Sequence, residues 1–303
     1  MNVNVTAIRS DKIYRKMIAA SDAEREDIYR YELMKPFEFK WQCIGVPLKA
    51  DQEGGYDAVA ASVMGGSYHP SQIIVQRCEE IEKISADSFW EVCQRSIQDS
   101  LGAFEKKGIN LTVQNYIFTI LLNDPKHPMS KMTGDYCGDG GIPGFIIGTI
   151  IPNEKSLKML PVALAHETNH NVRWQFMQWS PKISLADMIV SEGLAENFAA
   201  NMFGEDKVGI WVKNTSKEVL KNRIKPEIKK NLYEEDFQKI SAYLYGDDIM
   251  KIRGAEAVGM PYCAGYACGY ELVKQYLKKT GTSIYHATIT PTAEIMSEMK
   301  DFW

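Results

Sequence analysis

Apolar residues recur at helical spacing in several long segments of this chain. Residues 10–35 are rich in helix formers and carry a stripe made of Ile13, Met17, Ile18, Ile28 and Leu33. Residues three or four apart share one face of an α-helix, so this stripe predicts helices that pack by one side. The same reasoning predicts helices over about 70–82, 85–106, 214–230 and 261–279. We expect an irregular segment over residues 36–58 and a solvated, charged face over 214–230.

The hydrophobic pattern changes after Gly108. The segment LTVQNYIFTILL, which ends at Leu122, is β-branched and aromatic, and this predicts a buried strand. Within residues 138–151, turn glycines precede the short apolar run FIIGTII, which predicts a second strand. Together these patterns predict an α+β fold that is predominantly α-helical with a small β-sheet. They divide the chain into a helical N-terminal region, 1–108, and a second region, 109–303.

Composition places the chain among ordinary globular proteins. Its 303 residues can form one large or two ordinary domains, and its net charge of −4 predicts neither nucleic-acid binding nor a basic membrane face. No apolar run approaches the length of a membrane span, and the first residues lack the apolar core of a secretory signal. The six cysteines lack CxxC spacing, so we expect reduced core residues in a cytoplasmic protein.

The stretch His166-Glu167-Thr168-Asn169-His170 matches HExxH, the motif with which many hydrolytic zinc sites begin. Two histidines four apart project from one face of a helix, so both imidazoles can bind one metal ion. Glu167 lies beside them and is suited to accept a proton from an attacking water. The alternative is a helix with two surface histidines and an unrelated glutamate. We expect Pro161 in the first turn of this helix.

A third ligand decides which kind of zinc site this is. The metzincin pattern requires a glycine and then a histidine where this chain has Arg173 and Phe176, so that pattern is excluded. The other common solution is a glutamate on a following helix. Glu192 offers it, 22 residues after His170, within Ser191-Glu192-Gly193-Leu194-Ala195-Glu196-Asn197.

Glu192 and Glu196 are four residues apart and share one helical face. We assign Glu192 as the metal ligand and Glu196 as the acceptor of the free ring N–H of His166, which would fix the orientation of that ring. The alternative is that one or both are solvated surface charges. The surrounding helix argues against this because it is apolar over much of its circumference, at Leu185, Met188, Ile189, Ala195, Phe198, Ala199 and Met202. Ser184 with Asp187 predicts its capped start, and Gly204 its end.

HExxH followed by EGLAE resembles the gluzincin type of zinc peptidase and, more closely, the YjaZ-type family of predicted zinc-dependent proteases. Three further stretches resemble that family: WQCIGVPLKA from Trp41, GGYD from Gly54 and GYACGY from Gly265. The resemblance implies a zincin-like metallopeptidase core over 109–303, an active-site helix pair, a zinc cofactor and a peptide or protein substrate. Thermolysin-type gluzincins usually carry aspartate at the position of Glu196, so this chain departs from their pattern there.

The helix predicted over 261–279 carries Tyr262, Tyr266 and Tyr270 at four-residue spacing. Peptidases need a donor for the oxyanion that develops on the substrate, and a tyrosine hydroxyl can supply it. We assign Tyr266 to this role because it matches the GY motif of the family. The alternative is that the tyrosines serve packing. His286 and Arg253 are weaker candidates for the same role.

The sequence therefore predicts a zinc-dependent peptidase with Glu167 as general base. Two other classes stay open. One is a zinc-stabilised structural protein, in which Cys137 or His127 would supply a fourth ligand. The other is a non-catalytic, chaperone-like peptide-binding protein. Neither needs a base beside two ligands, so Glu167 favours the enzyme. The strand before the HExxH helix either is a substrate-side edge strand or serves as an ordinary strand.

Overall fold

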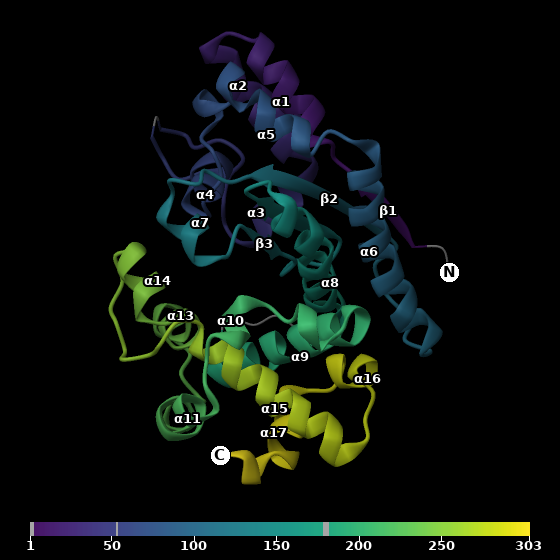
Figure 1. Ribbon diagram of the computed structural model, residues 1–303, viewed down its shortest axis with the longest axis vertical. Coiled ribbons are helices and arrows are strands. Elements are labelled where there is room, and N and C mark those ends of the chain that lie inside the picture. Colours follow the sequence, from purple (N-terminus) through teal and green to yellow (C-terminus); the bar gives the residue numbers. More distant parts are fainter. Residues whose placement is uncertain (1–2, 53, 178–181) are drawn as a thin grey trace. The chain divides into compact units, whose positions relative to one another are not determined.

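The computed structural model describes residues 3–52, 54–177 and 182–303 (Figure 1). The fold is α+β and predominantly helical with one small mixed sheet, which confirms the predicted class. The chain divides into two compact units: the first unit comprises 1–99 and 113–167, and the second 100–112 and 168–303. The boundary predicted after residue 108 stays a prediction. No helix among the described residues is both long and apolar enough to cross a membrane.

The sheet lies entirely in the first unit. Its four strands are β1 (Asn4–Ala7), β2 (Asn115–Leu122), β3 (Tyr136–Asp139) and β4 (Phe145–Ile150), in the order β1-β2-β4-β3. The pairs β1–β2 and β2–β4 are parallel, whereas β3 pairs antiparallel with β4. Both predicted strands are confirmed. Of the two alternatives left open for the second one, β4, the structure bears out the ordinary sheet strand, because β3 pairs on its outer side and occupies the edge.

Among the described residues of the first unit, eight α-helices occur: α1 (Ser10–Ala19), α2 (Asp22–Ile28), α3 (Glu38–Cys43), α4 (Ala58–Met64), α5 (Cys78–Lys83), α6 (Asp87–Lys106), α7 (Pro128–Met132) and α8 (Glu154–Phe176). Of these, α6 and α8 continue into the second unit. The segment 36–58 is less irregular than predicted, because α3 forms within it. The helix predicted over 70–82 is instead two short 3-10 turns followed by α5.

The second unit is helical and is built around α9 (Leu185–Phe203). The other helices are α10 (Ile210–Lys213), α11 (Lys217–Val219), α12 (Lys225–Lys230), α13 (Phe237–Tyr245), α14 (Asp247–Ile252), α15 (Ala264–Thr280), α16 (Ile284–Thr288) and α17 (Thr292–Glu298). Every residue of α9 from Ile189 to Ala200 is buried. The aromatic ring of Phe198 stacks on Phe104 at 4.9 Å between centroids, and Tyr285 closes this cluster edge-on.

The predicted limits of α9 are confirmed, whereas the predicted start of α8 is wrong. Ser184 and Asp187 form a reciprocal capping box, and Gly204 ends α9 with φ 102°. In α8, however, Pro161 is the eighth residue and lies inside the helix. The cap that decides the start is Asn153 with Ser156, whose side chains each accept from the other's backbone N–H at 2.9 Å.

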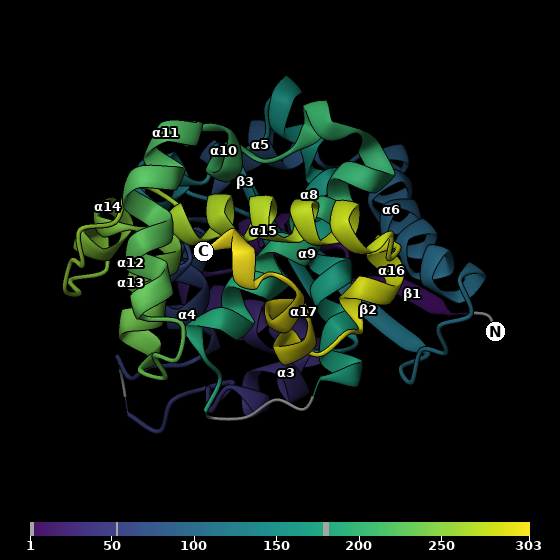
Figure 2. The ribbon, with the colours of Figure 1, turned by 90° about the horizontal axis from the view of Figure 1, so that it is seen from below.

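Helices α9 and α15 lie side by side, in contact along their length (Figure 2). Their closest approach is at Gly193 and Gly269. A Cβ on Gly193 would come within 2.1 Å of the Gly269 carbonyl oxygen, and a Cβ on Gly269 within 2.2 Å of the Ile189 carbonyl oxygen. The Asn197 side-chain amide donates to the carbonyl oxygens of both Gly193 and Tyr270, at 2.8 and 2.9 Å. The glycines of the EGLAE and GYACGY stretches therefore bring two helix backbones into contact.

Replacing either crossing glycine by alanine should force the two helices apart. We expect Gly193→Ala and Gly269→Ala each to lower the free energy of unfolding by about 1–3 kcal/mol, the usual cost of overpacking a tight core. Gly102→Ala in α6 is the matched control, because no atom lies within 4 Å of a Cβ placed there. That variant should instead stabilise by about 0.5–1 kcal/mol. Urea unfolding measures the free energy of unfolding of the three variants. Equal changes in all three would contradict a close contact of the helix backbones at Gly193 and Gly269.

Candidate metal centre

The HExxH residues lie within α8, which runs without interruption from Glu154 to Phe176. His166, Glu167 and His170 are all buried in it. His166 and His170 are separated by about one helical turn, so their rings extend from the same side of the helix. The alternative of two surface histidines is thereby excluded.

Helix α9 places Glu192 next to His170. The distance from His170 Nε2 to Glu192 Oε2 is 3.3 Å, and both side chains are buried. The other ring nitrogen, Nδ1, shares a hydrogen bond with Ser191 Oγ at 3.1 Å. This contact orients the ring so that Nε2 is the nitrogen that faces Glu192. Ser191 was not predicted, because a serine beside a glutamate carries no pattern that marks it as a partner of a distant histidine.

One ligand atom from each of His166, His170 and Glu192 lies within 4.8 Å of the other two. A tetrahedral zinc ion with bonds of about 2.0–2.2 Å holds its ligand atoms about 3.3 Å apart, so small side-chain adjustments suffice. Two imidazoles and one carboxylate are a donor set that zinc accepts, and the group fits it. Within the described residues, no further histidine, cysteine or acidic side chain belongs to this three-membered group. Cys137 and His127, the candidates for a closed site, are therefore not members of it.

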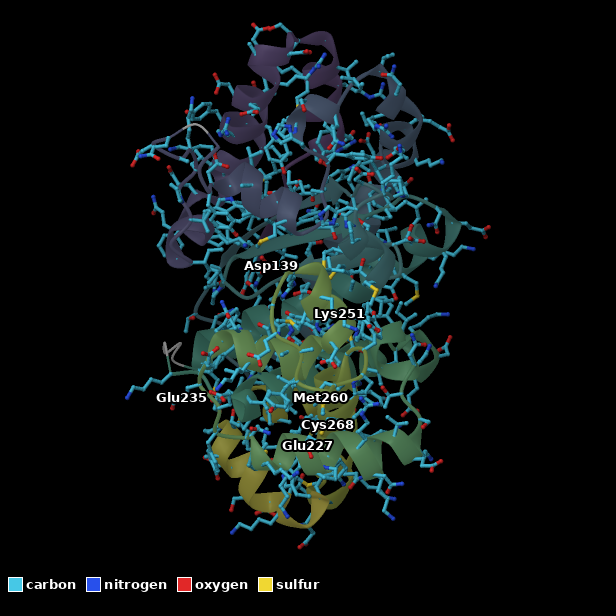
Figure 3. All side chains as sticks on the ribbon, turned by 90° about the vertical axis from the view of Figure 1, so that its left-hand side faces the viewer. Asp139, Glu227, Glu235, Lys251, Met260 and Cys268 are labelled. Carbon is cyan, nitrogen blue, oxygen red and sulfur yellow. The ribbon has the colours of Figure 1, made fainter. Side chains whose placement is uncertain are left out.

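The edge strand β3 lies directly against Glu167. A Cβ on Gly138 would come within 2.4 Å of Glu167 Cγ, and one on Gly140 within 2.3 Å of the Glu167 carbonyl oxygen. Only glycine permits this approach of strand to helix. Asp139, labelled in Figure 3, lies between the two glycines and forms an ion pair of 2.6 Å with the buried Lys40. Glu167 is thus confined by the backbone of β3.

Glu196 lies one turn after Glu192 and is buried. Its Oε1 accepts from the indole Nε1–H of Trp211, and its Oε2 accepts from the backbone N–H of Gly209 at 3.3 Å. The alternative that Glu192 and Glu196 are solvated charges is excluded by their burial. The predicted bond from His166 to Glu196 stays a prediction.

Tyr266 is in the first turn of α15, within the helix predicted over 261–279. Its ring contacts Trp211 edge-on, with 6.5 Å between centroids, and Tyr245 at 5.9 Å. Arg253 lies over the ring of Tyr245 at 4.7 Å. His286 is exposed on α16, where its Nδ1 bonds to Ser283 Oγ at 2.8 Å. The role of Tyr266 as oxyanion donor stays a prediction.

Comparison with known proteins agrees with this arrangement. Residues 89–297 match the model of the family described as "Predicted Zn-dependent protease (DUF2268)". The chain belongs to this family. It is also 31% identical over 297 residues to "Uncharacterized protein YjfC" of Bacillus subtilis (strain 168), with 98% of each chain covered. No solved structure matches. The family predicted from HExxH and EGLAE is therefore confirmed.

In this family member Arg173, in the last turn of the HExxH helix, holds the C-terminal end of that helix by hydrogen bonds. Its guanidinium is buried and donates to the carbonyl oxygens of Thr288 and Thr290, at 2.8 and 3.1 Å, and to Thr292 Oγ1 at 2.9 Å. Burial lowers the pKa of Arg173 to about 10, which leaves it charged at neutral pH. One turn earlier, the Asn169 side chain donates to Thr288 Oγ1 at 2.7 Å. The histidine-bearing helix is thus tied to residues 288–292.

Arg173→Met should remove all three bonds and leave the buried carbonyl oxygen of Thr288 and the partly buried one of Thr290 without this donor. We expect the free energy of unfolding to fall by about 2–4 kcal/mol. Arg223→Met is the control, because Arg223 is exposed and donates to a single carbonyl oxygen, that of Gly259. The control should change stability by about 0.5 kcal/mol or less. Denaturant unfolding measures both, and a loss at Arg173 no larger than the control would refute its fastening role.

Proposed function

We propose that this protein is a zinc-dependent peptidase of the gluzincin type, acting on a peptide or protein substrate. In this proposal His166, His170 and Glu192 are the zinc ligands and Glu167 is the general base. The observation that carries it is the convergence of two HExxH imidazoles and a carboxylate from α9 on one buried point. Membership of a family described as predicted Zn-dependent proteases supports it. A cytoplasmic location remains part of the proposal.

The chemistry divides between the metal and the chain. A bound zinc ion would lower the pKa of a coordinated water towards about 7 and polarise the substrate carbonyl. The Glu167 carboxylate accepts a proton from the attacking water and later delivers a proton to the departing amine. Its confinement against Gly138 and Gly140 restricts where that carboxylate can lie. Restricting the base to one location reduces the entropy lost when the reaction begins.

Two further residues complete the proposed site. Tyr266 donates a hydrogen bond from its hydroxyl to the oxyanion that develops as the substrate carbonyl is attacked. Glu196 accepts a hydrogen bond from the ring N–H of His166 and so keeps the other nitrogen directed to the metal. The absence of a fourth member from the metal-binding group, among the residues that the structure describes, supports an open coordination position. An open position is what separates hydrolytic zinc sites from structural ones.

Glu167→Gln should abolish hydrolysis while zinc stays bound, because the amide cannot accept the proton yet fills the same space. We expect the rate to fall by about 10²–10⁴. The measurement is metal analysis of wild type and variant together with cleavage of casein and of a peptide library, with and without chelator. Wild-type cleavage that chelator stops, and that Glu167→Gln lacks, supports the peptidase.

Other results would contradict the proposal. Normal activity in Glu167→Gln would remove the assigned base. Stoichiometric zinc without any cleavage would favour the zinc-stabilised structural protein. Absence of zinc from wild type, in both the purified and the zinc-reconstituted protein, would reject the metal site itself.

Ser191→Ala should weaken zinc binding, because the His170 ring loses the hydroxyl that orients it. We expect zinc affinity to fall by about tenfold, at the lower end of the effect of outer partners of metal ligands. Ser100→Ala is the matched control, since the buried hydroxyl of Ser100 makes no hydrogen bond among the described residues. Competition with a chromogenic chelator measures both affinities. Identical affinities for the two variants would show that Ser191 does not orient the ligand.

A further inference from the structure

Trp211 contacts two of the predicted site residues of the second unit, Glu196 and Tyr266. It lies on α10, and its indole Nε1–H donates to Glu196 Oε1. The backbone N–H of Gly209, two residues earlier, donates to the second oxygen, Oε2, at 3.3 Å. Both oxygens of one buried carboxylate are therefore bound by a single short segment of chain.

The glycine at position 209 allows both donors to reach Glu196. A Cβ on Gly209 would come within 2.1 Å of Cε2 in the Trp211 ring. The ring thus folds back over the glycine and occupies the volume that any other side chain would need. Because φ of Gly209 is −60°, the glycine is required for space and not for an unusual backbone conformation. Only with glycine here can the backbone N–H and the indole N–H reach the same carboxylate.

Two donors on two oxygens have a defined physical effect. A buried carboxylate is stable as an anion only when hydrogen bonds replace its lost water. Binding both oxygens also fixes the rotation of the carboxylate plane. Glu196 follows Glu192 by one turn on the same buried helix, so a fixed negative charge lies one turn from the proposed ligand.

The same ring also contacts the predicted oxyanion donor. Tyr266 packs edge-on against Trp211, and Tyr245 covers another side of Tyr266. Trp211 therefore contacts Glu196 through its N–H and Tyr266 through its ring. No pattern in the sequence marked this tryptophan, because α10 has only four residues and follows the EGLAE helix by a separate turn.

We propose that Trp211 is a positioning residue of the metal centre, which raises zinc affinity by fixing the charged Glu196. The inference rests on the proposed function, since it requires that His166, His170 and Glu192 bind zinc. Gly209 acts with Trp211 as the second donor and as the residue that makes room for the ring.

The test begins with Trp211→Phe, which keeps an aromatic ring against Tyr266 but removes the N–H. We expect zinc affinity of the full-length protein, measured by competition with a chromogenic chelator, to fall about tenfold. Trp303→Phe is the matched control, because the indole N–H of Trp303 is buried without a hydrogen-bond partner among the described residues. Its zinc affinity should equal that of wild type. A Trp211→Phe affinity within about twofold of wild type would overturn the inference.

A double-mutant cycle shows whether Trp211 acts through Glu196. Glu196→Gln removes the charge while keeping the shape, and it should weaken zinc binding on its own. In that background Trp211→Phe should cost no more than about twofold further, because the charge that it positions is gone. Full additivity of the two losses would mean that Trp211 acts by another route, and would overturn the inference.

The outcomes separate this inference from the function on which it rests. A wild-type protein without zinc affinity rejects the metal site and, with it, the role of Trp211. Zinc bound equally by wild type and Trp211→Phe rejects only the inference. Gly209→Ala is the second variant, and it should reproduce the loss of affinity by displacing the ring. Circular dichroism without metal checks folding, and failure of both variants to fold would assign Trp211 to the fold instead.

Discussion

The contact of α9 with α15 at Gly193 and Gly269 is the constraint on which the second unit depends. Two helix backbones touch there without intervening side chains, and Asn197 bridges them by hydrogen bonds. Glu192 directly precedes Gly193, so a shift of this crossing would move the proposed ligand relative to His170. Helix α15 covers one face of α9, and α13, α16 and α17 also pack against this buried helix. The carboxylate is therefore placed by packing, with its Oε2 3.3 Å from Nε2 of His170.

The features of α8 and α9 that could be predicted from the sequence are those set by residues close together in the chain. The spacing of His166 and His170 specifies a common helix face whatever surrounds it, and Ser184 with Asp187 specifies a start for α9. Those features depend on neighbours within four residues, and they were predicted correctly. The start of α8 was predicted wrongly from Pro161, because a proline marks a helix start only when no stronger cap precedes it. Asn153 with Ser156 is such a cap. The helix α3 within residues 36–58 was missed because it is too short to show a helical repeat of apolar residues.

What could not be predicted depends on residues far apart in the chain. Strand order is an example, because the apolar sequence of β4 does not indicate that β3 pairs on its outer side. Ser191 and Trp211 are others, since each meets a predicted site residue only once the helices have packed. The glycines 138 and 140 look like turn residues in the sequence. That Gly138 in β3 and Gly140 just after it form the surface against Glu167 becomes evident only in three dimensions.

The three acceptors of Arg173 have a consequence for the order in which the molecule is made. Thr288 lies 115 residues downstream of Arg173, yet it supplies a bond that the buried guanidinium requires. During synthesis from the N-terminus, the histidine-bearing helix therefore emerges long before its own fastening. A nascent chain that ends before residue 288 lacks these acceptors, so the Arg173 guanidinium cannot yet be buried with its hydrogen bonds made. The buried end of the HExxH helix can therefore be completed only after residues 288–292 have been synthesised.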